Sequence, residues 1–303
     1  MKILRFDDDR VGVLKGTDRV VDVSRLIGHR DERGPQRVME ELIGNFARYR
    51  AEMEKIAAAE TGVPMSSVRL LAPIPRPSKC LAAFVNYLDN AERTVETLPN
   101  EFFCKAPELV GPGAPVDLKN IEAVREVQPE AELAFVIGRH AKDVSEADAM
   151  DCVFGYMPFF DISARGLKRR SLLIPKGQDT FAPCGPWITT KDEVPDPHNL
   201  RVRSWVNGTP RQDYNTRDMA HKIPDQVSWL SRFIQLQVGD VIATGTFHKG
   251  LGPINPGDRL VIEIDGLGRA EFPVTGDSPP KTAWSSGKKE MLPLRPGSSL
   301  HHV

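Results

Sequence analysis

Three acidic residues lie next to two apolar runs and could share one metal ion. Glu130 and Glu132 open the run Leu133–Ile137, and Asp161 follows a second apolar run, Val153–Phe160. Side chains two residues apart on a strand point to the same face, so the first run, read as a strand, places both glutamates side by side. Like charges beside a low-dielectric wall must take up a proton or find a cation.

The chemistry of this acidic group favours a hard divalent ion. Three carboxylates without a nearby His or Cys suit Mg²⁺, or else Mn²⁺ or Ca²⁺. The alternative is that both glutamates lie on a solvent face and that Asp161 only begins a turn, because exposed acids are the common case. The spacing alone leaves both interpretations open.

Basic residues follow the third acid and could balance the charge of such a site. Three carboxylates and one divalent ion leave about one negative charge, so nearby cations are needed before an acidic substrate can bind. Arg165 and Lys176 are the candidates, whereas the basic run 168–170 is equally well explained as a solvated face. The span Gly166–Phe181 has no regular period, which predicts a covering loop that carries Lys176 over the site.

A series of linked motifs is similar to the signature of the fumarylacetoacetate hydrolase family. The match covers about residues 75–275. The resemblance implies a metal-dependent enzyme acting on a small 2-oxo or 2,4-dioxo acid, with the three acids as metal ligands. In chain order, the motifs are Glu130-Ala131-Glu132-Leu133, Gly155-Tyr156, Asp161 to Arg165, Lys176 to Pro186, Val206-Asn207-Gly208, Arg211-Gln212 and Gly239 to Thr246.

The resemblance also implies catalytic and substrate-binding roles. Lys176 and Glu132 are expected to be catalytic, since a lysine beside such a site could orient a water or protonate an enolate. Lys105 could neutralise a substrate carboxylate, although an exposed lysine at a strand end is the alternative. The residues expected to bind substrate are Arg165, Thr246, Gln212 and Lys105.

The chain departs from the family at one catalytic pair. Many members have a His, followed three residues later by a Glu, and the two form a dyad that activates water. Asn90 and Arg93 occupy the matching positions here. Because an amide cannot take a proton near neutral pH and a guanidinium never gives one up, this chain lacks that general base.

The missing dyad leaves the reaction open among several alternatives. Hydrolysis of a C–C bond is the family's usual reaction, whereas decarboxylation or enol–keto isomerisation of an oxaloacetate-like acid needs chiefly a cation that holds the enolate. His248, in a Gly-bounded loop, could replace the missing base, although a lone loop His is more often a surface residue. A non-catalytic relative that binds metal and a dicarboxylate is a further alternative.

Strand and helix patterns divide the chain into three parts. Residues 1–72 show three short strands, at Lys2–Arg5, Val11–Leu14 and Val20–Val23, and one amphipathic helix through Val38–Ile56. These elements predict a small N-terminal α+β domain. The Pro-rich connector Pro73–Pro77 marks its end. Residues 73–278 form the predicted catalytic metal-binding domain, and residues 279–303 have the composition of a loosely ordered tail.

The main domain is predicted to be rich in strands. Short strands are expected at Leu200–Val206, Val241–Ala243, Arg259–Ile264 and Arg269–Val274. A capping box at Ser145 predicts a short helix, and a second helix is expected at Ile223–Phe233. The predicted class is α+β and β-rich, and the resemblance implies a mixed β-sandwich roll.

Charge and hydropathy exclude several classes of partner. The formal net charge of −1 and the pI of about 6.7 give no electrostatic reason to bind nucleic acid or an anionic membrane. No apolar run reaches the roughly 18 residues of a membrane span, and the N-terminus does not have the form of a signal peptide. Four cysteines without a Cys-x-x-Cys pair indicate neither a disulfide framework nor a zinc site. We expect a cytoplasmic enzyme whose partner is a small 2-oxo acid, and the resemblance implies a homodimer.

Overall fold

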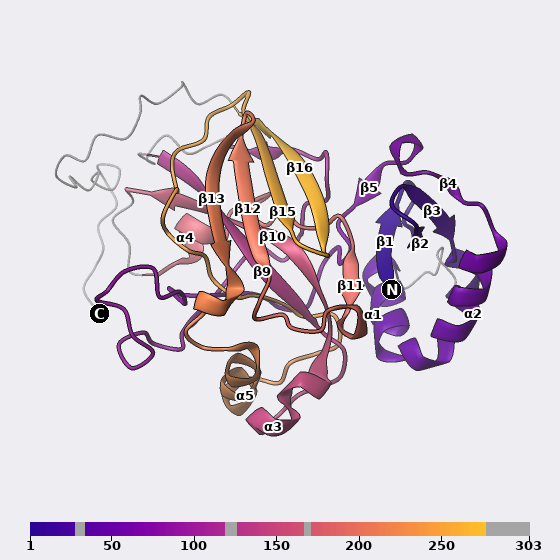
Figure 1. Cartoon of the computed structure of the whole chain (residues 1–303), viewed down its shortest axis with the longest axis horizontal. Coiled ribbons are helices and arrows are strands. Elements are labelled where there is room, and N and C mark those ends of the chain that lie inside the picture. The colour runs from indigo at the N-terminus through magenta and orange to yellow at the C-terminus, as the bar shows by residue number, and fades with distance from the viewer. Residues whose placement is uncertain (28–33, 119–125, 167–170, 277–303) are drawn as a thin grey trace, which may run out of the picture.

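The strands form two sheets in the computed structural model, which describes residues 1–27, 34–118, 126–166 and 171–276 (Figure 1). Within those residues, the larger sheet has the spatial order β4 (Val63–Pro64), β3 (Arg19–Asp22), β2 (Arg10–Lys15), β1 (Lys2–Phe6), β11 (Ile188–Thr190), β10 (Val153–Arg165), β9 (Glu126–Ile137), β14 (Val241–Ala243), β6 (Cys80–Ala83) and β7 (Phe102–Cys104), with β5 (Leu70–Leu71) beside β1. The smaller sheet has the order β13 (Thr209–Asn215), β12 (Arg201–Val206), β15 (Arg259–Ile264), β16 (Gly268–Thr275) and β8 (Val116–Asp117).

Few helices accompany these sheets in the described part of the chain. The α-helices are α1 (Gly34–Gly44), α2 (Phe46–Ala59), α3 (Glu146–Ala149), α4 (Leu173–Lys176) and α5 (Ile223–Phe233). Short 3₁₀ turns lie at Ser24–Leu26, Met65–Ser67, Met150–Cys152, Lys191–Glu193 and Thr216–Asp218. The predicted β-rich α+β class is confirmed, and the larger sheet is mixed because β14 pairs in parallel with β6.

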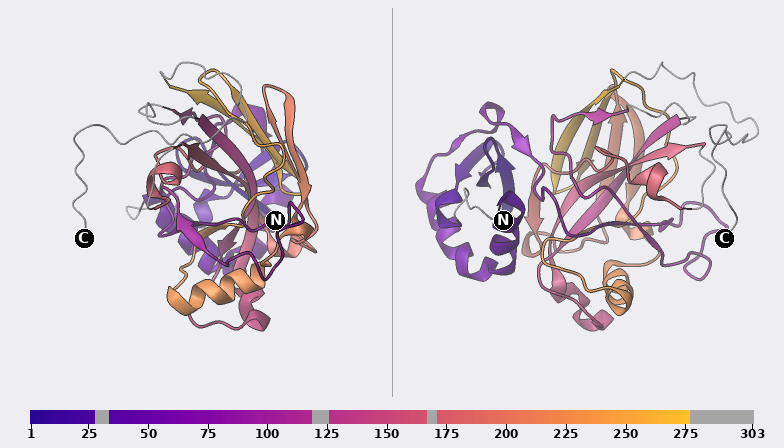
Figure 2. Two further views of the ribbon diagram at one scale, coloured as in Figure 1. Left: turned by 90° about the vertical axis from the view of Figure 1, so that its left-hand side faces the viewer. Right: turned by 180° about the vertical axis from the view of Figure 1, so that it is seen from behind.

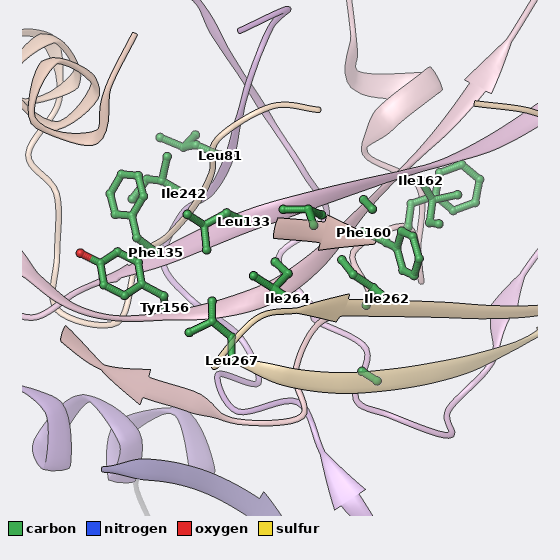
Figure 3. Close-up of a cluster of buried hydrophobic side chains, with 14 of the residues drawn as sticks. Leu81, Leu133, Phe135, Tyr156, Phe160, Ile162, Ile242, Ile262, Ile264 and Leu267 are labelled. Carbon is green, nitrogen blue, oxygen red and sulfur yellow. The ribbon is translucent and has the colours of Figure 1, made fainter. Parts of the chain in front are cut away.

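Strands β9 and β10 form the centre of the fold, and their two faces differ. Every second side chain, from Leu133 and Phe135 on β9 and from Phe160 and Ile162 on β10, enters the core between the two sheets. Figure 3 shows these side chains opposite residues of the smaller sheet such as Ile262. The alternate side chains point to the other face, and that face carries the acids.

The N-terminal strands β1–β3 lie within one residue of the predicted segments at both ends and join the larger sheet through β11, with Lys2 opposite Thr189. The single predicted helix is wrong, because two helices, α1 and α2, lie there. Gly44 ends the first helix, and Asn45 stands at the N-cap position of the second, with its side chain donating to the Glu41 carbonyl of α1 at 3.3 Å. Both residue types favour helix ends over helix interiors. Both helices still bury their apolar faces in one cluster. The boundary after residue 72 stays a prediction.

The predicted elements of the main domain agree closely with the observed strands and helices. The helix α5 has the predicted bounds, and Ser145 caps α3 by accepting a hydrogen bond from the Asp148 amide at 3.3 Å. Helices α3 and α5 lie side by side at one end of the molecule (Figure 2). All four cysteines are free. The predicted tail and the basic run 168–170 lie outside the described residues.

Several strands of the described chain were not predicted, namely β4, β5, β8, β11 and β13, and β13 is the longest of them. Its sequence, Thr209–Asn215, contains Pro, Asp and Asn, which are rare in central strands, and β13 is an edge strand that pairs only with β12 among the described strands. The signal that could have found it is Asn207-Gly208, because both residues have positive φ and this pair favours a two-residue hairpin turn. No helix in the described ranges is long and apolar enough to cross a membrane.

Candidate active site

Three carboxylates meet on one face of β9 and β10. The antiparallel register sets Asp161 directly opposite Glu130, and Glu132 is two residues further along the same face. One oxygen of each carboxylate lies within 4.8 Å of the others. Glu130, Glu132 and Asp161 are 4%, 1% and 0% exposed, so the solvent-face alternative is wrong. We call these three residues the carboxylate cluster.

Two lysines donate to the carboxylate cluster from neighbouring segments. Lys176, the last residue of α4, donates from Nζ to Glu130 Oε2 at 2.6 Å and to Asp161 Oδ2 at 2.5 Å. Lys105, which follows β7, donates to Asp161 Oδ1 at 2.5 Å and to the Ile162 carbonyl at 3.0 Å. Lys105 is buried, so the alternative of an exposed strand end is wrong.

Arg165 supplies a third positive charge from the end of β10. It lies on the same face of the strand as Asp161, and its guanidinium donates to Glu130 Oε1 and to Gln128 Oε1. All four oxygens of Glu130 and Asp161 therefore accept from a cation.

The pKa shifts follow from this arrangement of charge. Burial opposes ionisation of Glu130, but Lys176 and Arg165 outweigh it and lower the pKa of that carboxyl. Burial likewise opposes the charge of Lys176, yet Asp161 and Glu130 raise its pKa. Burial dominates at Lys105 and lowers its pKa, against the attraction of Asp161.

Glu132 is the carboxylate without a cationic partner among the described residues. It accepts one hydrogen bond, from the Gly245 amide to Oε2 at 2.9 Å. Burial, together with the negative charges of Asp161 and Glu130, raises the pKa of Glu132 well above its ordinary value. A buried group of three carboxylates in which one is uncompensated fits a hard divalent cation, since such ions take oxygen ligands.

A small cavity of about 60 Å³ opens onto Glu130 and Glu132 of the carboxylate cluster. Its polar lining includes Arg165, Lys176, Thr246 and His248, and the rest is mostly apolar, from segments such as Ala83–Val85. On this scale one water needs about 10–15 Å³, so the space suits a small acid of a few atoms. Larger substituents would have to extend through the open side.

His248 lines this cavity and is held by an aspartate. Its Nδ1 lies 2.8 Å from Asp89 Oδ2, and its backbone amide donates to the same oxygen at 2.9 Å. Arg93 donates to Asp89 Oδ1 at 2.5 Å. Asn90 is exposed; its Nδ2 donates to the same Asp89 oxygen at 3.3 Å, and its Oδ1 accepts from the Glu92 amide at 3.0 Å. The positions that match the family dyad thus hold no base, but a His reaches the cavity from another loop. Sequence reasoning missed Asp89.

Gln212 and Thr246 support the loop that carries His248. Gln212 Nε2 donates to Thr246 Oγ1 at 2.8 Å and to the Phe247 carbonyl at 2.6 Å, while its Oε1 accepts from the Ala131 amide at 3.0 Å. The side-chain amide of Gln212 is buried, and its oxygen and nitrogen both form hydrogen bonds. Gln212 does not line the cavity and lies behind Thr246. Thr246 itself reaches the cavity wall.

Comparison with known proteins gives matches to one family model and to several relatives. The family model described as fumarylacetoacetate (FAA) hydrolase C-terminal matches residues 79–275. The mitochondrial oxaloacetate tautomerase of Xenopus laevis is 41% identical over 222 residues, covering 69% of each chain, and the maleylpyruvate hydrolase of Aquipseudomonas alcaligenes is 33% identical over 284 residues, 88% of this chain and 97% of the relative.

Solved structures of similar proteins have the same fold as this chain. The maleylpyruvate hydrolase of Sphingobium sp. SYK-6 in complex with manganese(II) ion and pyruvate is 37% identical, with a TM-score of 0.81 over 92% of this chain and 100% of the other. The match to the family model spans well over half of the sequence and includes the whole carboxylate cluster. This chain belongs to the fumarylacetoacetate hydrolase family.

Proposed function

We propose that this protein is a metal-dependent hydrolase that cleaves a C–C bond of a small 2,4-dioxo acid. The observation that carries the proposal is His248, which lines the same cavity as Glu130 and Glu132 and can supply the base that the missing dyad would have provided. Relatives named as hydrolases also align along nearly the whole chain.

The carboxylate cluster would hold one divalent ion, Mg²⁺ or alternatively Mn²⁺ or Ca²⁺. The cluster's burial, its spacing and the uncompensated Glu132 support this role. The manganese(II) ion in the Sphingobium hydrolase structure adds support. When bound, the ion would supply a Lewis acid for the 2-oxo group and for the charge that develops on its oxygen.

The residues around the cavity can perform the proton transfers of the hydrolysis. His248 Nε2 accepts a proton from water as the water oxygen bonds to substrate C4. The C3–C4 bond breaks, and its electron pair stays with C3 as the enolate of the 2-oxo acid. Lys176 Nζ gives a proton to C3, Lys176 regains one from solvent, and His248 releases its proton to solvent. The products are a carboxylic acid and a 2-oxo acid such as pyruvate.

Arg165 and Lys176 would also bind the substrate carboxylate, with Thr246 beside them. Both cations line the cavity and already pair with carboxylate oxygens, so a substrate acid can compete for the same donors. Lys105 is buried behind Asp161 and is absent from the cavity lining. We therefore assign Lys105 to orientation of Asp161.

A second candidate is enol–keto tautomerisation or decarboxylation of an oxaloacetate-like acid. The 41% identity to an oxaloacetate tautomerase favours it, and both reactions need chiefly cations that hold the enolate. In either case the substrate is a small 2-oxo acid.

Substitution of His248 separates the two candidates. His248→Ala should slow acylpyruvate hydrolysis by at least about 100-fold, the lower end of what a positioned base contributes, and leave oxaloacetate tautomerisation nearly unchanged. Both substrates are assayed side by side with wild type, His248→Ala and Asn90→His. Asn90→His restores the family's residue at the dyad position, and we expect no gain in hydrolysis from it because the Asn90 side chain is exposed and Arg93 replaces the family's Glu. Rapid hydrolysis by His248→Ala would contradict the proposed base, and ligand-induced thermal stabilisation without any turnover would favour a non-catalytic relative.

We also propose, on the family resemblance, that the protein is a homodimer, and the cytoplasmic location stays a prediction. Light scattering at micromolar concentration should give about twice the 33.6 kDa chain mass. A mass of one chain would contradict the dimer.

A further inference from the structure

The carboxylate of Asp89 is almost completely surrounded by donors. Its side chain is 4% exposed, and it accepts from the His248 amide, from His248 Nδ1, from Arg93 and from Asn90 Nδ2. Burial would raise the pKa of Asp89, but the hydrogen bonds from His248 and the charges of His248 and Arg93 outweigh it, so the pKa lies below its ordinary value. Asp89 is therefore an acceptor only.

We propose that Asp89 is a positioning residue that fixes the tautomer and orientation of His248, which rests on the proposed role of His248 as the base. A carboxylate facing Nδ1 requires the proton there, and this leaves the lone pair on Nε2. Arg93 Nη1 lies 3.1 Å from Nδ1 but can only donate, so its hydrogen bond goes to Asp89. Arg93 thus keeps Asp89 charged and in place.

The two loops that carry this pair are tied to each other and to the core. Asn86, at the start of the Asp89 loop, donates to the Thr244 carbonyl at 2.9 Å and accepts from the His221 amide at 2.8 Å. On the other side, Gln212 donates to the Phe247 carbonyl, next to His248. Both backbones are held by buried amide groups, so the His248 ring has little freedom apart from rotation, which Asp89 restricts.

The His–carboxylate pair of this chain comes from other sequence positions than the family's dyad. The family's His and Glu positions are Asn90 and Arg93 here, and neither can act as a base. The acid is instead Asp89, one residue before Asn90, and the base comes from the loop after β14. Arg93 then has a definite role, since it pairs with the acid of the relocated pair.

Replacement of Asp89 by Asn tests the proposal. The amide of Asn can donate to Nδ1 and move the imidazole proton to Nε2, where it blocks the base. We expect ¹⁵N NMR of His248 to change from the Nδ1–H to the Nε2–H tautomer, kcat for acylpyruvate hydrolysis to fall at least about tenfold, and KM to change less than about threefold. Asp89→Glu, which keeps a carboxylate, should restore part of kcat and the original tautomer.

The chain offers a matched control in a second His–Asp pair. His221 Nδ1 lies 2.7 Å from Asp225, in a pair that does not line the cavity. Asp225→Asn should leave kcat and the His248 signals unchanged, and thermal melting checks that each variant is folded.

An unchanged His248 tautomer in Asp89→Asn, or an unchanged kcat where wild type hydrolyses the substrate, would overturn the proposal. Absence of hydrolysis by wild type would instead contradict the proposed function, and the NMR comparison would still decide the role of Asp89.

Discussion

Glu132→Gln and Asp161→Asn are each expected to abolish turnover and to lower Mg²⁺ affinity while the protein stays folded. Each change removes one charged oxygen donor from the carboxylate cluster, and hard cations depend on that charge. The loss of affinity should exceed the roughly 10- to 100-fold that removal of an outer-shell partner costs. Calorimetric titration with MgCl₂ or MnCl₂ measures it.

The matched control for these variants is Glu126→Gln. Glu126 is a buried glutamate on the same strand, but it lies outside the carboxylate cluster and bonds to Gln128. Its replacement should leave metal affinity within a few-fold of wild type. Wild-type metal binding by both Glu132→Gln and Asp161→Asn would exclude the cluster as the metal site.

Glu132 also makes the folding stability of the metal-free protein depend on pH. Its pKa is raised in the folded state, so the group contributes stability that is fully present below the unfolded pKa of about 4.3 and is lost as pH rises through the folded pKa. Glu132→Gln should remove this loss. Chemical denaturation with EDTA present, from acidic to neutral pH, should therefore show a smaller decline for the variant than for wild type; parallel declines would contradict the assignment.

Lys176→Met is expected to raise the affinity for metal and to lower the rate of turnover. The Lys176 ammonium bridges Glu130 and Asp161, so a divalent ion must displace it or bind beside it against charge repulsion. Removal of the ammonium should raise metal affinity about tenfold. Turnover should nevertheless fall by roughly 1,000-fold, because the enolate loses both its proton donor and a stabilising charge.

If a metal ion displaces the Lys176 ammonium from the carboxylate cluster, the neighbouring Phe103 ring can hold it. The ammonium already lies 5.0 Å from the centre of this ring, which allows a cation–π contact. Because Lys176 ends α4, whose Leu173 and Ile174 are exposed, the segment can shift with it as the predicted covering loop. Hydrogen exchange of residues 171–181 should slow when oxalate binds together with metal, and unchanged exchange would contradict a lid.

A suitable control for Lys176→Met is Lys142→Met. Lys142 is half exposed and donates to backbone carbonyls at the end of α5, away from the carboxylate cluster. It should change neither metal affinity nor turnover. Weaker metal binding by Lys176→Met would show that the ammonium supports the cluster instead of competing with the ion.

Local sequence patterns predicted those features of the site that are set within a single strand. The period of two along β9 was enough to place Glu130 and Glu132 on one face, and the apolar runs gave the buried strands. That Asp161 lies opposite Glu130 depends on the register between β9 and β10, which no pattern within either strand specifies. The family resemblance supplied that link.

Contacts between distant loops could not be predicted from the sequence. The Asp89–His248 pair joins residues 159 positions apart, and neither residue belongs to a periodic segment. The burial of Lys105 depends on how the chain after β7 packs against β10. The break between α1 and α2 is different, because Gly44-Asn45 carried a local signal that the continuous apolar spacing concealed.

The most direct test of metal-dependent hydrolysis is product analysis of an acylpyruvate reaction run in H₂¹⁸O. With Mg²⁺ present, the wild-type protein should give equal amounts of pyruvate and a carboxylic acid, with one ¹⁸O atom introduced into the acid at the former C4 carbonyl. EDTA or Glu132→Gln should stop both products. Release of CO₂, exchange at C3 without cleavage, or full activity in EDTA would contradict metal-dependent C–C hydrolysis.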